Sequence, residues 1–317
     1  MDEQQPRRTL SRRALIGGAV GVGAVAIAGG GALVLPRLFE GPASGVLADR
    51  LVASGVFTVA HRGGSLDWPE MSMLGYRNSV GLGVDALEIS LARSSDGVWF
   101  GLHDATLDRT SGTSGFVASE HTWDEIRRHR IGAKGTTDPS QPAQPYLRFE
   151  ELVTAYAATH AIFVDPKVVP GSHFDELFAM MAASPTPKRT FVAKGYCTSA
   201  EWAQAATAHG YRTWGYYYAS EVQADPDLLG RTEELWDWLG LDYGGAAEVW
   251  RTFEATSKPV LAHVVPSESA AETARKRGAA GLVISGVREV LGHSANPQGP
   301  RGGSAAFSKR GHPRMVL

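Results

Sequence analysis

The chain alternates short apolar runs with segments of helical character. Nine runs rich in apolar, β-branched and aromatic residues recur between residues 56 and 285. A helical segment such as Thr198 to His209 begins at candidate capping residues and is followed by Gly210. Strands that alternate with helices predict a parallel α/β fold, and about eight such units fit a (β/α)8 barrel, the TIM barrel. The nine runs are residues 56–61, 86–92, 98–103, 161–167, 190–194, 212–218, 238–243, 259–265 and 281–285.

A hairpin explains the one run in excess of eight. Runs 86–92 and 98–103 are joined only by Arg93 to Gly97. This link is too short for a crossover helix, and it ends in an Asp-Gly turn signal. We therefore expect an antiparallel β-hairpin, which folds His103 back toward the end of the sheet that carries Glu88.

The pattern divides the chain into three parts. The segment 51–292 is predicted to form the barrel, with a lid-like insertion at about 111–145 that is rich in polar residues, Gly and Pro. Residues 1–50 are predicted to be an export signal or membrane anchor followed by a stem. Residues 293–317, rich in Gly, Pro and Arg, are predicted to be a disordered tail.

The N-terminal segment predicts where the protein works. Residues 1–13 are polar and basic, and Ala14 to Leu35 follows without a charge, about the length that crosses a bilayer core. Ser11 to Ile16 resembles the twin-arginine export motif; the alternative is a permanent single-span anchor. Either reading places the folded part outside the cytoplasm: extracellular, in the cell envelope or membrane-anchored. Contact with the membrane then occurs through this segment if it is not cleaved.

Charge and cysteine content exclude several classes of protein. The 317 residues carry a formal net charge of −2, which argues against nucleic acid as a partner. Cys197 is the only cysteine, so neither an internal disulfide nor a thiolate metal cluster can form. Candidate chemistry therefore rests on histidines, basic residues and carboxylates.

One such stretch follows the first apolar run, at a predicted strand end, where α/β barrels carry their chemistry. It is His61-Arg62-Gly63-Gly64. Histidine exchanges protons near neutral pH, the guanidinium fork of arginine matches phosphate oxygens, and glycine lets a backbone approach a ligand. The stretch is therefore a candidate phosphate site.

Three carboxylates lie within or just after apolar runs: Glu70, Glu88 and Asp165. Hard oxygen ligands from separate strands suit Mg²⁺ or Ca²⁺. A buried carboxylate also needs a cation, so the alternative is a set of salt bridges to Arg62, Lys167 and similar residues. Both interpretations stay open at this point.

Several motifs in order resemble the glycerophosphodiester phosphodiesterase family. The likeness covers roughly residues 57–292; it is strong through residue 110 and weak between about 195 and 275. The similar segments are His61 to Tyr76, Gly83 to Leu91, His103-Asp104-Ala105-Thr106-Leu107-Asp108-Arg109-Thr110, Pro145 to Leu152 and Gly278 to Ser285.

The resemblance implies a TIM barrel and a metal-assisted attack on a phosphodiester, with glycerophosphodiesters as substrate and Mg²⁺ or Ca²⁺ as cofactor. It implies that two histidines form an acid/base pair, that basic residues face the phosphate and that carboxylates ligate the metal. The residues in these roles are His61 and His103; Arg62 and Lys167; and Glu70, Glu88 and Asp165.

This sequence departs from the family pattern at Ser90, where the family normally has an aspartate ligand. A neutral serine is a poor ligand, so metal affinity should fall. The departure permits a degenerate protein that only binds phosphate or lipid. Asp165-x-Lys167, in place of Glu-x-Lys, is closer to the related sphingomyelinase D branch, so cleavage of lipid head groups is a further alternative.

The weaker candidates lie at later strand ends. Lys194 could face the pocket and bind substrate, or lie on the surface with its charge in water. Trp214, Tyr216 and Tyr218 could line an apolar subsite or belong to the core, and His263 could be structural.

Overall fold

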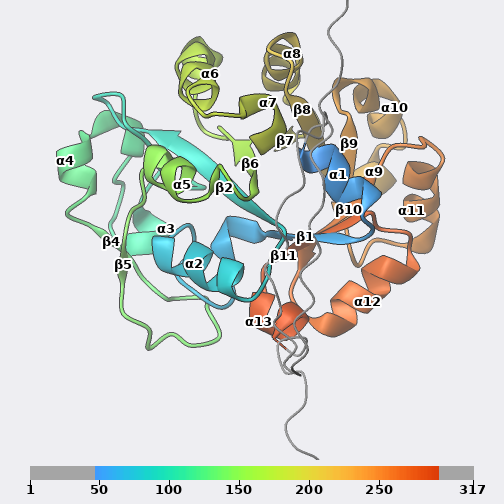
Figure 1. The fold of residues 1–317 in the computed structure, drawn as a ribbon, viewed down its shortest axis with the longest axis horizontal. Coiled ribbons are helices and arrows are strands. Elements are labelled where there is room, and N and C mark those ends of the chain that lie inside the picture. Colours follow the sequence, from blue (N-terminus) through green and yellow to red (C-terminus); the bar gives the residue numbers. More distant parts are fainter. Residues whose placement is uncertain (1–46, 293–317) are drawn as a thin grey trace, which may run out of the picture. The chain divides into compact units, whose positions relative to one another are not determined.

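A closed barrel of eight parallel strands forms the centre of the computed structural model, which describes residues 47–292 (Figure 1). β1 pairs with both β2 and β11, and this double pairing closes the sheet. The (β/α)8 barrel predicted from the alternation of strands and helices is confirmed. Its strands are β1 (Phe57–Ala60), β2 (Ala86–Arg93), β6 (Ala161–Asp165), β7 (Phe191–Tyr196), β8 (Arg212–Tyr217), β9 (Trp238–Asp242), β10 (Val260–Val265) and β11 (Gly281–Ile284).

Helices surround the strands in Figure 1. The helix predicted from Thr198 is α8, which begins at Ala200 after Ser199. The helical elements around the barrel are α1 (Leu47–Ala53), η1 (His61–Gly63), α2 (Met73–Gly81), α5 (Phe149–Tyr156), η3 (Gly171–His173), α6 (Phe174–Ala182), α7 (Pro187–Thr190), α8 (Ala200–Ala208), α9 (Ala219–Ala224), α10 (Leu228–Thr232), η4 (Glu233–Leu235), α11 (Ala247–Glu254), α12 (Glu268–Lys276) and α13 (Val287–Leu291).

The predicted hairpin is also confirmed. β3 (Trp99–Gly101) pairs antiparallel with β2, with Leu91 opposite Gly101. Because β3 runs back along β2, it returns the chain to the end of the barrel at which Glu88 lies. The hairpin therefore brings His103, which follows β3, to that end.

The insertion at 111–145 has a small apolar cluster of its own beside the barrel, in which Phe116 and Trp123 pack around Phe100. It contacts the loop after β1, since the Thr137 amide donates to the carbonyl oxygen of Leu66 at 2.7 Å. Its role as a lid stays a prediction. The elements in and next to the insertion are α3 (Asp108–Ser111), η2 (Ala118–Glu120), α4 (Trp123–Ile126), β4 (Arg130–Ile131) and β5 (Gln144–Pro145).

Alternate residues of each strand point into the barrel. Phe57 and Val59 of β1 pack there with Phe163 of β6 and Trp214 of β8 in a buried cluster. The intervening residues, such as Ile89 on β2, pack against the surrounding helices. One face of each strand thus packs in the barrel interior and the other packs against the helices. Because both faces are buried, the strand sequences are nearly continuous apolar runs.

The two ends of the chain lie outside the described residues. The export signal or anchor predicted at 1–50 and the disordered tail predicted at 293–317 therefore stay predictions. Within residues 47–292, no helix combines the length and the apolar character that crossing a bilayer requires.

Candidate active site

At the carboxyl ends of the strands, the inward positions change from apolar to ionisable or phenolic. Each polar residue stands two positions beyond an apolar inward one: His61 follows Val59, and Lys194 follows Val192. The period of two that fills the barrel with apolar side chains thus also aims polar groups at its mouth. The residues at these positions are His61 after β1, Glu88 on β2, Asp165 on β6, Lys194 on β7, Tyr216 on β8 and His263 on β10.

The loop after β1 has an unusual backbone. Arg62 adopts a left-handed conformation (φ 49°), which a non-glycine residue takes only where the surroundings compel it. Its amide donates to Glu88 Oε2 at 2.7 Å, and its carbonyl oxygen accepts from the Met71 amide at 2.7 Å. This turn places His61 and Arg62, the first two residues after β1, at the mouth of the barrel.

Gly64 is required in the same loop. It has φ +86°, and a Cβ at this position would lie 2.8 Å from the Trp68 ring. Gly64→Ala is therefore expected to lower the free energy of unfolding by about 2 kcal/mol or more, since a clash adds to the strain of a positive φ. Urea unfolding followed by tryptophan fluorescence measures the loss.

Gly83→Ala is the matched control, because Gly83 has φ +88° but no atom within 4 Å of its would-be Cβ. Only the backbone strain applies there, about 1 kcal/mol. Equal losses at the two glycines would contradict the packing argument.

His61 and His103 line the same pocket, of about 50 Å³, together with Arg62, Lys167 and Lys194. Five predicted site residues that are distant in the sequence therefore meet at one mouth of the barrel. Their chemical roles stay predictions.

The two imidazoles are held differently. Nδ1 of His103 lies 2.7 Å from Asp104 Oδ1, so the carboxylate holds a proton on Nδ1 and leaves Nε2 free to accept another. Nδ1 of His61 lies 3.4 Å from Ser65 Oγ. Burial and the nearby Arg62 guanidinium lower the pKa of His103 to about 4 and hold the pKa of His61 well below its ordinary value. Both imidazoles are therefore neutral at pH 7 in the free site.

The carboxylates contact cations of the protein. Lys194 Nζ lies 2.6 Å from Glu88 Oε1 and 3.2 Å from Asp165 Oδ2. Glu70 accepts from the two terminal nitrogens of Arg109 at 2.7 and 2.9 Å and lies 3.3 Å from Arg62. These contacts match the salt-bridge interpretation that the sequence left open.

The pKa shifts of Glu88 and Lys194 agree with the short distance between their charged groups. Burial alone would raise the pKa of Glu88, but Lys194, His61 and Arg62 lower it to about 2. Burial would lower the pKa of Lys194, but Glu88 and Asp165 raise it. Both groups therefore stay charged at pH 7. Burial raises the pKa of Asp165, whose contact with Lys194 is the longer of the two.

An aromatic rim completes the pocket. Trp214, Tyr216, Tyr218 and His263 line it, and Lys167 Nζ donates to Tyr216 Oη at 2.8 Å. Tyr217 points the other way, where its hydroxyl lies 2.8 Å from Thr232 Oγ1 in the outer core. Trp214 belongs to the interior core as well as to the pocket.

The buried His263 makes stability depend on pH. Its Nε2 donates to the Tyr217 carbonyl oxygen at 2.9 Å, and burial lowers its pKa to about 4 despite the nearby Asp242. An unfolded histidine has a pKa of about 6.5, so the unfolded chain binds more protons between these values. Stability is therefore expected to fall as the pH falls from about 6.5 toward 4.

The measurement is urea unfolding at several pH values. His263→Gln is expected to flatten the dependence between pH 7 and 5, whereas His209→Gln, on an exposed residue outside the barrel, should leave it unchanged. An unaltered slope in His263→Gln would contradict the assignment.

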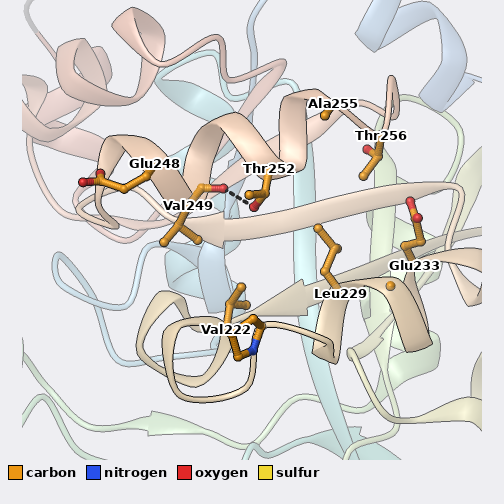
Figure 2. Close-up of a pocket in the computed structure, with 10 residues that line it drawn as sticks. Val222, Leu229, Glu233, Glu248, Val249, Thr252, Ala255 and Thr256 are labelled. Atoms are coloured by element: carbon orange, nitrogen blue, oxygen red, sulfur yellow. Dashed lines mark hydrogen bonds between the residues drawn. The ribbon is translucent and has the colours of Figure 1, made fainter.

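One larger hollow of the described residues is unsuited to an anion. A cavity of about 420 Å³ lies between α9, α10 and α11 on the outside of the barrel. Figure 2 shows Val222, Leu229 and Val249 in it, with the carboxylates of Glu233 and Glu248 at its edges. No cationic side chain lines it, whereas Arg62, Lys167 and Lys194 line the smaller pocket at the strand ends.

Comparisons with known proteins agree with this location. The model of the glycerophosphoryl diester phosphodiesterase family matches residues 61–171, a segment that includes His61, Glu88, His103, Asp165 and Lys167. Residues 61–171 of this chain thus match the glycerophosphoryl diester phosphodiesterase family. The resemblance of the sequence motifs to this family is therefore confirmed.

Curated relatives match over part of their length. The chain is 36% identical over 76 residues to the glycerophosphodiester phosphodiesterase of Caldanaerobacter subterraneus, a match that covers 24% of this chain and 31% of that protein. It is 32% identical over 113 residues to glycerophosphodiester phosphodiesterase 1 of Rattus norvegicus, covering 35% of this chain and 34% of the relative. The chain thus spans about a third of the length of these relatives.

Solved structures share the fold over most of the described barrel. A glycerophosphodiester phosphodiesterase from Agrobacterium tumefaciens superposes with a TM-score of 0.60 at 15% identity, covering 75% of this chain and 99% of that one. A phosphodiesterase from Oleispira antarctica, in complex with sn-glycerol-3-phosphate, gives a TM-score of 0.59 at 18% identity, covering 78% and 99%. These likenesses support the barrel architecture.

Glycerophosphoryl diester phosphodiesterases generally use a divalent cation, but the residues of this chain do not fit one well. Within residues 47–292, no three His, Cys, Asp or Glu side chains lie together as a metal site requires. The predicted ligand set of Glu70, Glu88 and Asp165 is instead divided between two arginines and Lys194. These ion pairs do not fit a bound cation, and the ligand role of the three carboxylates stays a prediction.

The charge of Lys194 strengthens this conclusion. A dication about 4 Å from the ammonium would be repelled by about 8 kcal/mol at an effective dielectric constant of about 20. Asp165 Oδ2 accepts no hydrogen bond within the described residues, but it lies 3.2 Å from the ammonium. A metal could therefore reach Glu88 and Asp165 only by displacing Lys194.

Sequence reasoning missed one residue of the site, Arg109. Its guanidinium holds both oxygens of Glu70, and its Nε donates to Asp104 at 2.6 Å. Arg109 thereby links Glu70 to the carboxylate that orients His103. Its place in the His-Asp-x-x-Leu-x-Arg-Thr segment was visible in the sequence, but its partners were not.

Proposed function

We propose that this protein hydrolyses glycerophosphodiesters to an alcohol and glycerol phosphate. The observation that carries the proposal is one pocket in which two neutral imidazoles, His61 and His103, stand among three cations. The cations are Arg62, Lys167 and Lys194. Such a pocket attracts a phosphodiester anion and can move protons on both sides of it.

The geometry favours His103 as the proton acceptor. Asp104 holds the Nδ1 proton of His103, so Nε2 can take a proton from an attacking water or substrate hydroxyl. As the new oxygen–phosphorus bond forms, the bond to the alcohol oxygen breaks, and that oxygen needs a proton. His61 is the second imidazole of the pocket, and the charge of a bound phosphodiester favours its protonation, so we assign it as the donor.

The cations hold the phosphoryl group. Arg62 offers a planar fork of donors, whereas Lys167 and Lys194 offer compact positive charges. These groups offset negative charge that moves onto the phosphoryl and leaving oxygens during the reaction. Tyr216 orients the Lys167 ammonium through the 2.8 Å hydrogen bond.

The test is hydrolysis of sn-glycero-3-phosphocholine by the full-length protein, followed by release of choline and glycerol phosphate. We expect turnover, and we expect intact sphingomyelin and phosphatidylcholine to be poorer substrates, because the pocket of about 50 Å³ admits a phosphate-sized group. Turnover of intact lipid alone would instead favour the lipid head-group alternative. Binding without turnover of either would favour the degenerate binding protein.

We further propose that this activity lies outside the cytoplasm. The support is the basic segment 1–13 followed by the uncharged Ala14 to Leu35. Separation of cells into cytoplasmic, membrane and external fractions tests the location. Twin lysine replacement of Arg12 and Arg13 should retain the protein in the cytoplasm if the segment is a twin-arginine signal.

A further inference from the structure

Lys194 lines the pocket and stands between two carboxylates. It lies on β7, next to β6 with Asp165, which in turn lies next to β2 with Glu88. Strand pairing brings these residues together, since Ser90 is level with Asp165 and Val164 is level with Ala193. The contact is therefore built into the register of the barrel.

The ammonium is buried but not enclosed. The Lys194 side chain is 7% exposed, and it lines the pocket that also contains His61 and His103. Its Nζ donates to Glu88 Oε1 at 2.6 Å and lies 3.2 Å from Asp165 Oδ2, which accepts no hydrogen bond within the described residues. An ammonium has three donors, and the hydrogen bond to Glu88 uses one of them, so donors remain for a ligand in the pocket.

The neighbouring Ser90 balances the charge. Its hydroxyl donates to Glu88 Oε1 at 3.3 Å, so a neutral side chain stands where a third carboxylate would face the ammonium. Two carboxylates with one monovalent cation carry a net charge of −1. Three carboxylates with one divalent cation carry the same net charge. The pair Ser90 and Lys194 is thus electrostatically equivalent to an aspartate and a dication.

We propose that the Lys194 ammonium takes the position of a divalent cation, so that this site binds the phosphoryl group of its substrate without metal. The proposal rests on the proposed phosphodiesterase function and deepens it. Lys194 then contacts a phosphoryl oxygen with a remaining donor, while the hydrogen bond to Glu88 and the ion pair with Asp165 position the ammonium. This assignment explains why the carboxylates that could ligate a metal are occupied by a side chain of the protein.

The first test is binding, measured apart from turnover. The full-length protein is stripped with EDTA and titrated with CaCl₂, MgCl₂ and sn-glycerol 3-phosphate by calorimetry. We expect no stoichiometric uptake of either metal, and equal affinity for sn-glycerol 3-phosphate with EDTA and with added Ca²⁺ or Mg²⁺. Uptake of one metal per chain, or loss of phosphate binding in EDTA, would overturn the proposal.

The second test removes the Lys194 ammonium and then asks whether a divalent metal ion can replace it. Lys194→Met should weaken binding of sn-glycerol 3-phosphate about tenfold or more, because a charge-assisted contact is lost. The double variant Lys194→Ser with Ser90→Asp should acquire a stoichiometric Ca²⁺ or Mg²⁺ site and bind sn-glycerol 3-phosphate only with that metal. Failure of the folded double variant to bind either metal would argue against equivalence of the two arrangements.

The control is Lys276→Met on the exposed face of α12, which should change neither binding property. Circular dichroism shows whether each variant is folded; if Lys194→Met is not, the wild-type titrations still decide the proposal. Binding of sn-glycerol 3-phosphate that requires metal overturns this inference and leaves the proposed function standing. Absence of such binding under every condition counts against both.

Discussion

Replacement of His103 by alanine is expected to lower kcat for sn-glycero-3-phosphocholine by about 10²–10⁴-fold, the usual contribution of a general acid or base. The imidazole lines the pocket with three cations, and its Nδ1 is committed to Asp104 at 2.7 Å. Removing it leaves no group at this position to accept a proton. His61→Ala is expected to have an effect of the same order, and the double variant should lose little more than either single variant.

Both alanine variants are expected to lower kcat while the protein remains folded. KM should change little, because Arg62, Lys167 and Lys194, the cations that we propose hold the phosphate, remain. Steady-state kinetics with matched circular dichroism spectra separates the two effects. His209→Gln, outside the barrel, is the control and should keep full activity. Wild-type rates in folded His103→Ala would exclude His103 as a proton-transfer group.

The acidic limb of the rate profile should identify the acceptor. With a pKa of about 4, His103 is neutral above that value and can accept a proton. We therefore expect kcat/KM to fall as the pH falls through about 4, because protonated His103 cannot act as a base. Asp104→Asn removes the carboxylate that orients the ring and should lower kcat while leaving the binding of phosphate intact.

The second large effect is expected in stability. Glu88→Gln leaves the buried Lys194 ammonium without its 2.6 Å partner, and breaking a buried ion pair costs about 3–5 kcal/mol. Lys194→Met in the same background removes this ammonium, whose remaining partner is Asp165 at 3.2 Å. The double variant should recover part of the loss, because it no longer buries an ammonium that has lost its closer partner, and the raised pKa of Asp165 favours the neutral acid there.

An exposed pair is the matched control. Arg93 donates to Glu176 at 2.7 and 3.1 Å, with the glutamate side chain 45% exposed. Glu176→Gln should cost no more than about 1 kcal/mol, as is usual for surface ion pairs. Urea unfolding measures all four proteins. Equal losses from Glu88→Gln and Glu176→Gln would mean that Lys194 does not depend on Glu88.

The architecture could be predicted from the sequence because its signals are local. Nine apolar runs correspond to the nine strands of the main sheet, and the short Asp-Gly link identified the antiparallel one. The position of His103 at the mouth followed from that hairpin. These features depend on periodicity and turn chemistry, which are readable within about ten residues.

The partners of the carboxylates could not be predicted in the same way. Glu70 could face a metal or a cation on sequence grounds, and its actual partner, Arg109, is 39 residues away. Whether Lys194 reaches Glu88 depends on the relative register of β2, β6 and β7. No local signal encodes register between strands that are separated by whole helices, so ligand sets that depend on it remain open until the strands are placed.

The pairing of the first strand with the last has a consequence for synthesis. β1 lies between β2 and β11, and the loop after β1 is held by residues near the end of the barrel: the Leu66 amide donates to Ser285 O at 3.1 Å, and the Arg288 amide to Asp67 Oδ2 at 2.9 Å. A nascent chain lacks these contacts until β11 leaves the ribosome. His61 and His103 are therefore synthesised well before the loop that carries His61 can adopt its folded conformation. We expect the growing chain to lack phosphodiesterase activity until β11 has left the ribosome.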